Sequence, residues 1–290
     1  YISEGYGPVM MEQILKARKQ IYNYDLIRAI IFCLIISTLY FLFYWAKIGK
    51  NTAIIFLTAI VLIDLIGISN RYIDREMFVS PRQKKGLFQP RSGDQAILQD
   101  DSRFRVFEPS LQLSGARTSY FHSSLGGYHG AKPRRFEELF DYFSTHQIQG
   151  VMDMLNVKYL LFEEASQQKV VDNLTALGNA WTIDSLKVAS SADDLLEQMK
   201  TLDFSNQALV LKNETPQNIP HRFNSDATKE IYLISAKPTN LRYAFSASEE
   251  QMVVFSEIYY PNGWYAEIDG KAVDHFPVNY VLRGMLVPAG

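Results

Sequence analysis

The chain has 290 residues and a net charge of -2, with 29 Lys and Arg against 31 Asp and Glu, which excludes a strongly basic nucleic-acid-binding domain. Its single cysteine, Cys33, excludes an intramolecular disulfide framework. The apolar residues are concentrated before residue 70, and the remainder is long enough for a globular domain with its own core. Because the chain opens at Tyr1 without methionine or a charged leader, we expect no signal peptide and a fragment of a longer protein.

Two long apolar runs stand out near the start of the chain. Residues 26–46 contain one charged side chain, Arg28, and residues 52–68 contain one, Asp64. An apolar run of about 18 residues or more is long enough for a helix that crosses a lipid bilayer. The polar break at 47–51 is so short that the chain must reverse there. The pattern therefore predicts a transmembrane helical hairpin.

The predicted hairpin occupies residues 25–72. Residues 1–24 precede it as an amphipathic lead-in segment, whose helix begins at Pro8. Asp25 and Arg28 are three residues apart, so they can pair on a helix. The alternative is a buried hairpin of a soluble helical protein, since such helices are also apolar all round. The membrane is favoured by aromatic residues at the ends of both runs, where amphipathic rings lie at a bilayer interface: Tyr22, Tyr24, Tyr44, Trp45 and Tyr72.

The charged residues of the hairpin raise two further questions. A carboxylate within a span is costly, so Asp64 is expected to contact a neighbouring helix or water, or to take part in an ion relay. The flanks of the hairpin carry more positive residues than its loop, which favours a cytoplasmic soluble domain. These flanking residues are Lys16, Arg18, Lys19, Arg71, Arg75, Arg82, Lys84 and Lys85.

Residues 73–100 are predicted to be a linker, because the stretch is rich in Pro, Gly, Gln and charge. Residues 101–215 follow as a mixed α/β subdomain in which short apolar runs alternate with amphipathic ones. One predicted helix ends at Gly178, and the other begins at Ser191 with acidic residues after it. The predicted strands are 103–107, 157–162, 181–188 and 208–211, and the predicted helices are 168–177 and 191–202.

After residue 215 the pattern changes to strands alone. Apolar and polar residues alternate over 241–245 and 264–268, which is the period of a half-buried strand. The Asp-Gly pair at 269–270 is a strong signal for a two-residue hairpin turn. With a last run at 281–287, the pattern predicts a jelly-roll-like β-sandwich over 216–290 whose closing strand lies beyond the end of the chain. The fold class is therefore α+β: a transmembrane helical hairpin, a mixed α/β layer and a β-sandwich.

The stretch 125–135 combines three glycines with three cations ahead of a helix that starts near Pro133. Free backbone amides at a helix start and nearby cations favour a phosphate or pyrophosphate. The stretch is not a Walker loop, because its lysine is followed by proline, and the alternative is a flexible loop with a solvated basic helix start. The predicted binding residues here are Tyr128, His129, Lys132, Arg134 and Arg135.

Aromatic residues cluster around the Pro-Asn-Gly turn at 261–263. Tyr259, Tyr260, Trp264 and Tyr265 lie next to this turn, and such rings can stack on a sugar. Packing in a core or at a sheet edge is the alternative. Trp264 is the predicted sugar-binding residue.

Catalytic and metal-binding patterns are weak. His122, His129 and His146 have no Cys or carboxylate at ligand spacing, so we expect no metal site and no cofactor. The chain has no Gly-x-Ser-x-Gly elbow, and Cys33 lies in an apolar run, so no catalytic residue is identified. Whether this chain is itself an enzyme stays open.

A set of short motifs is spread over the chain. They are Gly127-Tyr128-His129, Ala131-Lys132, Leu155-Asn156-Val157-Lys158-Tyr159, Leu177-Gly178-Asn179-Ala180-Trp181, Phe255-Ser256-Glu257-Ile258-Tyr259-Tyr260, Gly263-Trp264, Ile268-Asp269-Gly270, Asn279-Tyr280-Val281-Leu282-Arg283 and Val287-Pro288-Ala289-Gly290. These motifs resemble those of YfhO-type bacterial membrane proteins, most closely the Bacteroidetes-like members. The resemblance extends from the Asp25/Arg28 helix start to the end of the chain, and the late motifs are quite specific.

The resemblance implies a polytopic protein related to the C-type (GT-C) glycosyltransferases, which use polyprenyl-phosphate sugars at the outer face of the cytoplasmic membrane. The catalytic acid of such enzymes lies in an early outer loop, upstream of the region that this chain resembles, so no catalytic residue is carried over. The resemblance also implies that the soluble domain is extracytoplasmic, against the charge count. The expected partners are membrane lipid and a polyprenyl-phosphate sugar or a cell-envelope polysaccharide, with no nucleic acid.

Two other functions remain open. A non-catalytic carbohydrate-binding or scaffold module of a membrane protein would bind sugar without an acidic outer loop upstream. Part of a lipid or polymer transporter would carry further charged intramembrane residues like Asp64.

Overall fold

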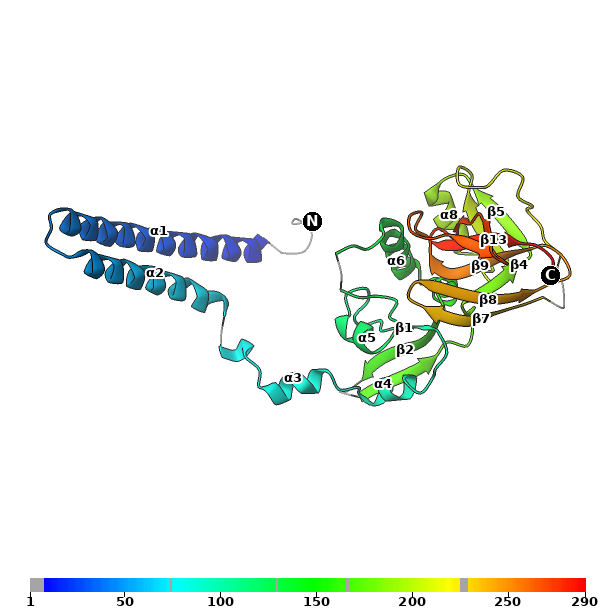
Figure 1. Ribbon diagram of the computed structural model, residues 1–290, viewed down its shortest axis with the longest axis horizontal. Helices are drawn as coiled ribbons and strands as arrows, with labels where there is room; N and C mark the ends of the chain where they lie inside the picture. The colour runs from blue at the N-terminus through cyan, green and yellow to red at the C-terminus, as the bar shows by residue number, and fades with distance from the viewer. Residues whose placement is uncertain (1–7, 74, 129, 165–166, 225–228) are drawn as a thin grey trace. The chain divides into compact units, whose positions relative to one another are not determined.

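The computed structural model describes residues 8–73, 75–128, 130–164, 167–224 and 229–290. The chain forms two compact units, residues 1–88 and residues 89–290 (Figure 1). We refer to them as the helical unit and the globular unit.

The helical unit is built on two long antiparallel helices, α1 (Pro8–Tyr44) and α2 (Lys50–Tyr72), which lie side by side (Figure 1). Both are long enough and apolar enough to cross a membrane. The described part of the predicted lead-in, residues 8–24, is not a separate helix, because α1 continues from Pro8 without a glycine or a further proline to break it. A short 3-10 helix, η1 (Arg75–Met77), and α3 (Pro81–Leu87) follow α2.

Charged side chains connect the two long helices. Arg28 on α1 places Nη2 2.6 Å from Oδ1 of Asp64 on α2, and its Nε donates to the same oxygen at 3.0 Å. Nη2 of Arg71 lies 2.7 Å from Oδ1 of Asp25. The neighbour expected for Asp64 is therefore Arg28, while the predicted pair within α1, Asp25 and Arg28, is looser at 3.9 Å.

The globular unit contains helices and strands throughout. Its helices are α4 (Ser92–Ile97), α5 (Ala116–Phe121), α6 (Arg134–His146), α7 (Gln149–Met154) and α8 (Ala192–Met199). Its strands are β1 (Arg105–Phe107), β2 (Val157–Glu164), β3 (Gln167–Asp172), β4 (Ala180–Ile183), β5 (Ser185–Ala189), β6 (Gln207–Leu211), β7 (Glu230–Lys237), β8 (Asn240–Ser246), β9 (Gln251–Ile258), β10 (Ala266–Ile268), β11 (Lys271–Val273), β12 (Phe276–Val278) and β13 (Leu282–Val287).

A four-stranded antiparallel sheet in the order β12-β13-β9-β4 forms the centre of the globular unit. A second sheet has the order β1-β2-β3, with β1 parallel to β2. The remaining strands pair as β5 with β6 in parallel, and as the hairpins β7-β8 and β10-β11. Helices and mixed sheets together make an α+β fold, as predicted.

The two faces of the central sheet are covered by different elements. On β9, Met252 and Val254 join the large core that also includes buried residues of α6, α7, α8, β5 and β6. Val253 belongs to a cluster on the other face, against which Ile231 of β7 and Ile268 of β10 pack. The hairpins and the sheet form a small β-sandwich, whereas the jelly-roll connectivity stays a prediction. Since β4 belongs to this sheet, the segments predicted as separate subdomains over 101–215 and 216–290 share one core.

Most predicted elements after residue 100 are present. β1, β2, β6 and α8 fall within or close to their predicted ranges, and α8 begins as expected with the Ser191 hydroxyl accepting the amide of Asp194 at 3.1 Å. The predicted turn joins β10 to β11, where Asp269 and Gly270 have φ angles of 49° and 77°. Trp264 lies outside the strand, which begins only at Ala266.

Three predictions are wrong. Where a helix was predicted over 168–177, residues 168–172 belong to the strand β3, whose backbone pairs antiparallel with β2 and whose Val170 packs against a small core under that sheet. The strand predicted over 181–188 divides at Asp184, whose amide donates to Asn206 and whose carbonyl accepts from Phe223. The linker predicted over 73–100 contains α4, which is buried against β3 through Gly93 and Ile97.

Candidate functional site

Three exposed aromatic side chains belong to the connection between β9 and β10, which we call the aromatic connection (residues 259–265). Tyr260, Trp264 and Tyr265 are 54%, 40% and 82% exposed. Gly263 has a φ of 80°, in the left-handed region that glycine adopts without steric cost, so the chain can turn between Tyr260 and Trp264. The connection therefore presents its rings to solvent instead of packing them all in the core.

The guanidinium of Arg283 on β13 stacks against the ring of Trp264. Only 6% of Arg283 is exposed, and its guanidinium carbon lies 4.4 Å from the centre of the Trp264 ring. The same carbon lies 5.5 Å from the ring centre of Tyr259. Nη2 of Arg283 donates to the carbonyl oxygen of Ile258 at 3.0 Å. A cation held in this way attracts the indole ring and fixes its orientation.

His275, just before β12, completes the surroundings of Arg283. Its Nε2 lies 3.4 Å from Nη1 of Arg283, and its ring meets the edge of Tyr259 with 5.6 Å between ring centres. Burial lowers the pKa of His275, and the charge of Arg283 lowers that pKa further. A neutral imidazole can accept a hydrogen bond from Arg283, so His275 helps to hold the guanidinium under Trp264.

This arrangement is suited to binding a ring-shaped polar ligand. Indole and phenol rings combine large apolar faces with a polar tip, so they can stack on the apolar face of a sugar ring and bond to its hydroxyls. Trp264 is held in place on one side by Arg283 and still has two-fifths of its surface exposed. We therefore take the aromatic connection, with Arg283 and His275, as the candidate functional site.

The globular unit also has a shallow groove of about 540 Å³. It lies between β4 and β7 and is lined by Trp181, Thr182, Asn206, Lys229 and Tyr232, among others. Two of its polar groups already have protein partners, since Nζ of Lys229 donates to Asp184 at 2.9 Å and the side-chain amide of Asn206 donates to Asp203 at 2.8 Å. These two side chains are therefore not free to bind a ligand in the groove.

The glycine-rich stretch 125–135 has the predicted helix start, with Pro133 as the N-cap of α6. Tyr128 is highly exposed and Lys132 is half-buried, whereas His129 lies outside the described residues. Two of the glycine amides are used within the protein, because Gly126 donates to the Ser124 hydroxyl at 3.2 Å and Gly127 donates to the carbonyl of Leu113 at 3.1 Å. Fewer free amides remain for a phosphate than the sequence suggests.

The two arginines at the start of α6 have different surroundings. Arg134 is exposed and pairs with Glu138 at 2.7 Å, one turn further along the helix. Arg135 makes two hydrogen bonds to Glu214, at 2.6 and 3.0 Å, and stacks over the ring of Tyr280. Arg135 therefore joins α6 to two other segments, and its charge is largely balanced.

Tyr280 extends this contact. Its hydroxyl donates to Glu138 at 2.5 Å, which holds the pKa of that carboxyl below its usual range, with Arg134 adding to the effect. Burial and the Glu138 carboxylate raise the pKa of Tyr280 to about 12. These contacts involve the basic residues of α6, whereas the ring contact of Trp264 is with Arg283, so the predicted phosphate and sugar residues lie on different elements.

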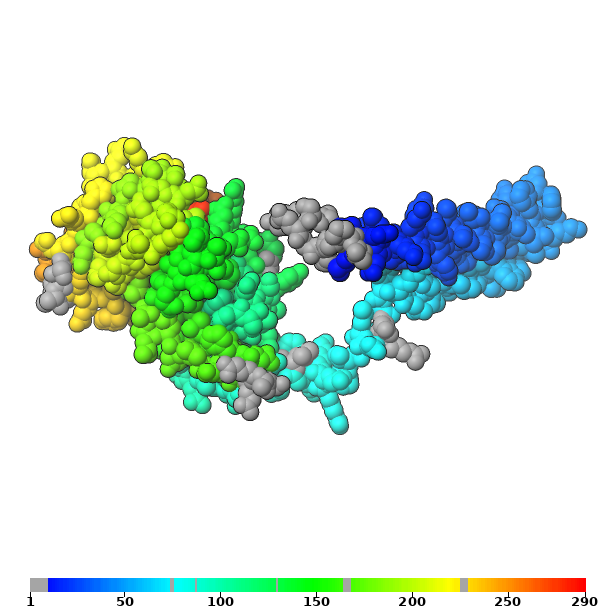
Figure 2. Space-filling model, turned by 180° about the vertical axis from the view of Figure 1, so that it is seen from behind, coloured from blue at the N-terminus to red at the C-terminus, as the bar shows by residue number. Residues whose placement is uncertain are grey.

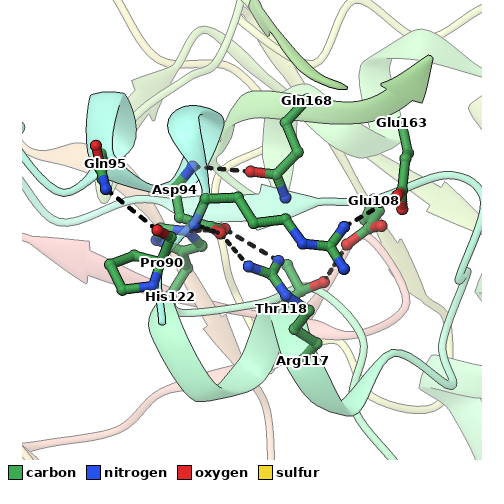
Figure 3. A network of polar contacts seen from close by, with 10 residues as sticks. Pro90, Asp94, Gln95, Glu108, Arg117, Thr118, His122, Glu163 and Gln168 are labelled. Atoms are coloured by element: carbon green, nitrogen blue, oxygen red, sulfur yellow. Dashed lines mark hydrogen bonds and ion pairs between the residues drawn. The ribbon is translucent and has the colours of Figure 1, made fainter. Parts of the chain in front are cut away.

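A buried polar network joins α4 to α5 and β3 (Figure 3). The Asp94 carboxylate is fully buried and accepts from Arg117 and from Nε2 of His122, the latter at 3.1 Å. The amide of Asp94 donates to the side chain of Gln168 at 3.2 Å. Nearby, the hydroxyl of Thr118 donates to Glu108 at 2.5 Å. These hydrogen bonds and ion pairs connect α4 to α5 and β3, so the network fixes the fold around α4.

Of the histidines weighed for metal binding, His122 and His146 have other partners, and His129 lies outside the described residues. His122 belongs to the Asp94 network, and Nδ1 of His146 lies 2.9 Å from the carbonyl oxygen of Tyr142. Within the described ranges, no group of three His, Cys, Asp or Glu residues could hold a metal ion.

Arg283 and His275 are the site residues that sequence reasoning missed. A signal for Arg283 was present, because a charged residue in the apolar run 281–287 must find a partner when it is buried. The sequence could not show that this partner is the Trp264 ring, which follows from the pairing of β13 with β9.

Comparisons with protein-family models, with curated proteins and with solved structures found no match to this chain.

Proposed function

We propose that this chain is the membrane anchor and outward-facing sugar-binding unit of a polytopic GT-C-like glycosyltransferase of the YfhO type. It would lie in the cytoplasmic membrane of a bacterium and orient a polyprenyl-phosphate sugar or a cell-envelope polymer for transfer. The catalytic residues would belong to another part of the parent protein. The support comes from the resemblance of the motifs, from the helical unit and from the aromatic connection.

The surface of the helical unit supports the anchoring role. α2 has no buried side chain, and Ile55, Ile63 and Leu65 are more than half exposed. Figure 2 shows the two helices as a rod of side chains, drawn in dark blue to cyan. Apolar side chains on all sides of a helix are stable in lipid but not in water. The ion pairs of Arg28 and Arg71 reduce the cost of the charges between the helices.

The exposed Trp264 ring, held by buried Arg283, is the observation that carries the sugar-binding role. In the same proposal, Tyr128, Lys132 and Arg134 contact the phosphate of the lipid-linked sugar. Arg135 would act mainly by holding α6 against Tyr280 and Glu214. The strands after residue 215 would belong to a jelly-roll-like sandwich.

The two alternatives differ in what supports them. A non-catalytic carbohydrate-binding or scaffold module would use the same aromatic connection, and it differs from the proposal only in the rest of the parent protein. A transporter would need an uncommitted acid along its path. Asp64 is committed to Arg28, which speaks against that role for this carboxylate.

Binding of a short-chain polyprenyl-phosphate glucose to the full chain in detergent tests the proposal. Replacing Trp264 with Ala should weaken binding about tenfold or more, because a stacked aromatic ring provides on the order of 1 kcal/mol beyond its buried area. The matched control is Tyr232→Ala, which removes an exposed ring from the groove beside β4. Loss of binding in the control and not in the Trp264 variant would refute the assignment.

A further inference from the structure

The segment that follows α2 has an unusual surface for a linker. Phe78 and Met77 are 73% and 66% exposed, and Ile73 and Val79 are also exposed. Ile73 directly follows Tyr72, the last residue of α2, and the other three come within seven residues of it. Met77, Phe78 and Val79 are consecutive, and Asp74, Arg75 and Glu76 separate them from Ile73. In water, exposed apolar residues in such a run are unfavourable and mark a surface that contacts something else.

Positive charge lies next to these apolar residues. α3 carries Arg82, Lys84 and Lys85, all exposed. The helix is fixed at its start by a capping box, in which the Ser80 hydroxyl accepts the amide of Gln83 and the Gln83 side chain accepts the amide of Ser80. Met77, Phe78 and Val79 therefore lie just before a capped helix that carries the three cations.

The first part of α1 adds a second basic group at the same end of the hairpin. The ion pair between Asp25 and Arg71 places these two residues at one level, so the residues of α1 before Asp25 extend past the end of α2 (Figure 1). This part of α1 carries three exposed cations within four residues, Lys16, Arg18 and Lys19. One end of the hairpin is thus basic on both of its chain segments.

We propose that residues 75–88 bind an anionic phospholipid surface, with Met77, Phe78 and Val79 inserted at the boundary between headgroups and acyl chains. The cations of α3 and of the first part of α1 would contact headgroup phosphates. An amphipathic stretch with both features binds at this depth, and each feature strengthens the other. The inference rests on the hairpin being a membrane anchor, as in the proposed function.

The proposal also gives the basic flanks a role that does not depend on topology. Positive residues beside a transmembrane helix are commonly interpreted as a sign of the cytoplasmic side. Cations that bind anionic headgroups can lie at whichever leaflet contains such lipids. The charge count of the flanks is then compatible with an outward-facing globular unit.

Single-site labelling of the full chain tests this inference. Cys33 is the only cysteine, so a Cys33→Ser, Phe78→Cys chain carries one environment-sensitive fluorophore at the position of Phe78. The chain is reconstituted in vesicles of phosphatidylcholine alone and in an equal mixture with phosphatidylglycerol, with spin-labelled lipids as quenchers. We expect quenching of this label by shallow spin labels to be about twofold stronger in the anionic vesicles, because headgroup charge draws the basic segment to the surface.

Variants that remove positive charge show whether the cations of α3, and not the net charge of the protein, are responsible for lipid binding. Replacing Arg82, Lys84 and Lys85 with Gln should reduce quenching in the anionic vesicles to the level seen in phosphatidylcholine. The matched control replaces three exposed lysines of the globular unit with Gln and should leave quenching unchanged. The control lysines are Lys187, Lys212 and Lys237.

Two further label positions make the result decisive. A label at Ile63 on α2 reports whether the hairpin is in the bilayer, and a label at Leu174 reports an exposed site of the globular unit. If the Phe78 label is no more quenched than the Leu174 label while the Ile63 label is quenched, the inference is wrong and the anchor stands. If the Ile63 label is also unquenched, the membrane anchor itself is wrong.

Discussion

Asp94 has a fully buried carboxylate in the globular unit, and its protonation state is set by its neighbours. Burial acts to raise the pKa of Asp94, but hydrogen bonds from Arg117, from the Arg91 amide and from His122 outweigh it and hold that pKa below its usual range. A carboxyl whose pKa is lower in the folded than in the unfolded state stabilises the fold above the unfolded pKa. This stabilisation is lost as the pH falls through the folded pKa.

The first prediction concerns this carboxyl. Replacing Asp94 with Asn should lower the free energy of unfolding of the full chain by about 3 kcal/mol near neutral pH, because Arg117 loses its charged partner. The variant should also show a shallower loss of stability below about pH 4, the region where an unfolded aspartate titrates. Urea unfolding followed by near-ultraviolet circular dichroism, repeated across pH, gives both quantities.

Asp101→Asn is the control for this experiment, because Asp101 is an exposed aspartate close to the same segment. It should retain the wild-type stability at neutral pH. An Asp94 variant with the same stability and the same pH slope as the control would show that the buried network does not stabilise the fold.

The candidate site shows how far single residues could be predicted. Trp264 was identified because aromatic residues cluster around a Pro-Asn-Gly turn. The basic residues of α6 were also identified, but the pairing of Arg135 with Glu214 joins positions 79 apart in the chain. Such a pairing is set by the fold and leaves no trace in local spacing, so the sequence could not show that this cation is already balanced.

Among the elements, α4 and β3 pack against each other and were both wrongly predicted. Each is short, and its local pattern is ambiguous: α4 begins beside Pro90 and contains Gly93, and β3 has the Gln-Gln-Lys start of a helix. Their structures are set by tertiary contact, since β3 pairs with β2 and α4 covers the side chains of both strands. Local propensity is a weak guide where such packing decides.

The second prediction concerns the packing of α4. A Cβ atom at Gly93 would lie 2.8 Å from Cβ of Gln168 and 2.9 Å from Cδ1 of Leu161. Replacing Gly93 with Ala should therefore destabilise the globular unit by about 1–3 kcal/mol, the cost of overpacking. The change is measured as a shift of the urea midpoint of the full chain.

Gly86→Ala in α3 is the matched control, because a Cβ atom there has no neighbour within 4 Å. It should be neutral or stabilise α3 by up to about 1 kcal/mol through helix propensity. Equal effects of the two substitutions would mean that α4 is not packed against β2 and β3.

The two long helices of the hairpin, α1 and α2, were predicted well from their apolar runs. In lipid, a long apolar run must satisfy its backbone hydrogen bonds internally and therefore forms a helix, and the short reversal between the two runs makes them neighbours. The hairpin turn at 269–270 was equally clear, because its φ angles require an Asp-Gly type of sequence. The division of the predicted strand at Asp184 could not be predicted in this way. It results from backbone hydrogen bonds of Asp184 to Asn206 and Phe223, which are distant in the sequence.

At the scale of the whole molecule, the chain combines two surfaces of opposite character. The globular unit buries a large shared core, and the helical unit leaves its apolar side chains exposed. Burial of such side chains in lipid is favourable by roughly 1.5–3 kcal/mol each, so water is a poor solvent for this unit. The sugar-binding and lipid-binding proposals both depend on this unit being embedded in a bilayer.

Carbonate extraction of membranes from cells that express the full chain tests most directly whether the helical unit is embedded in a bilayer. The extraction removes peripheral proteins and leaves integral ones in the pellet. We predict that the chain stays in the membrane pellet and is released only by detergent. Recovery of the chain in the supernatant, as a monodisperse particle without detergent, would contradict the account.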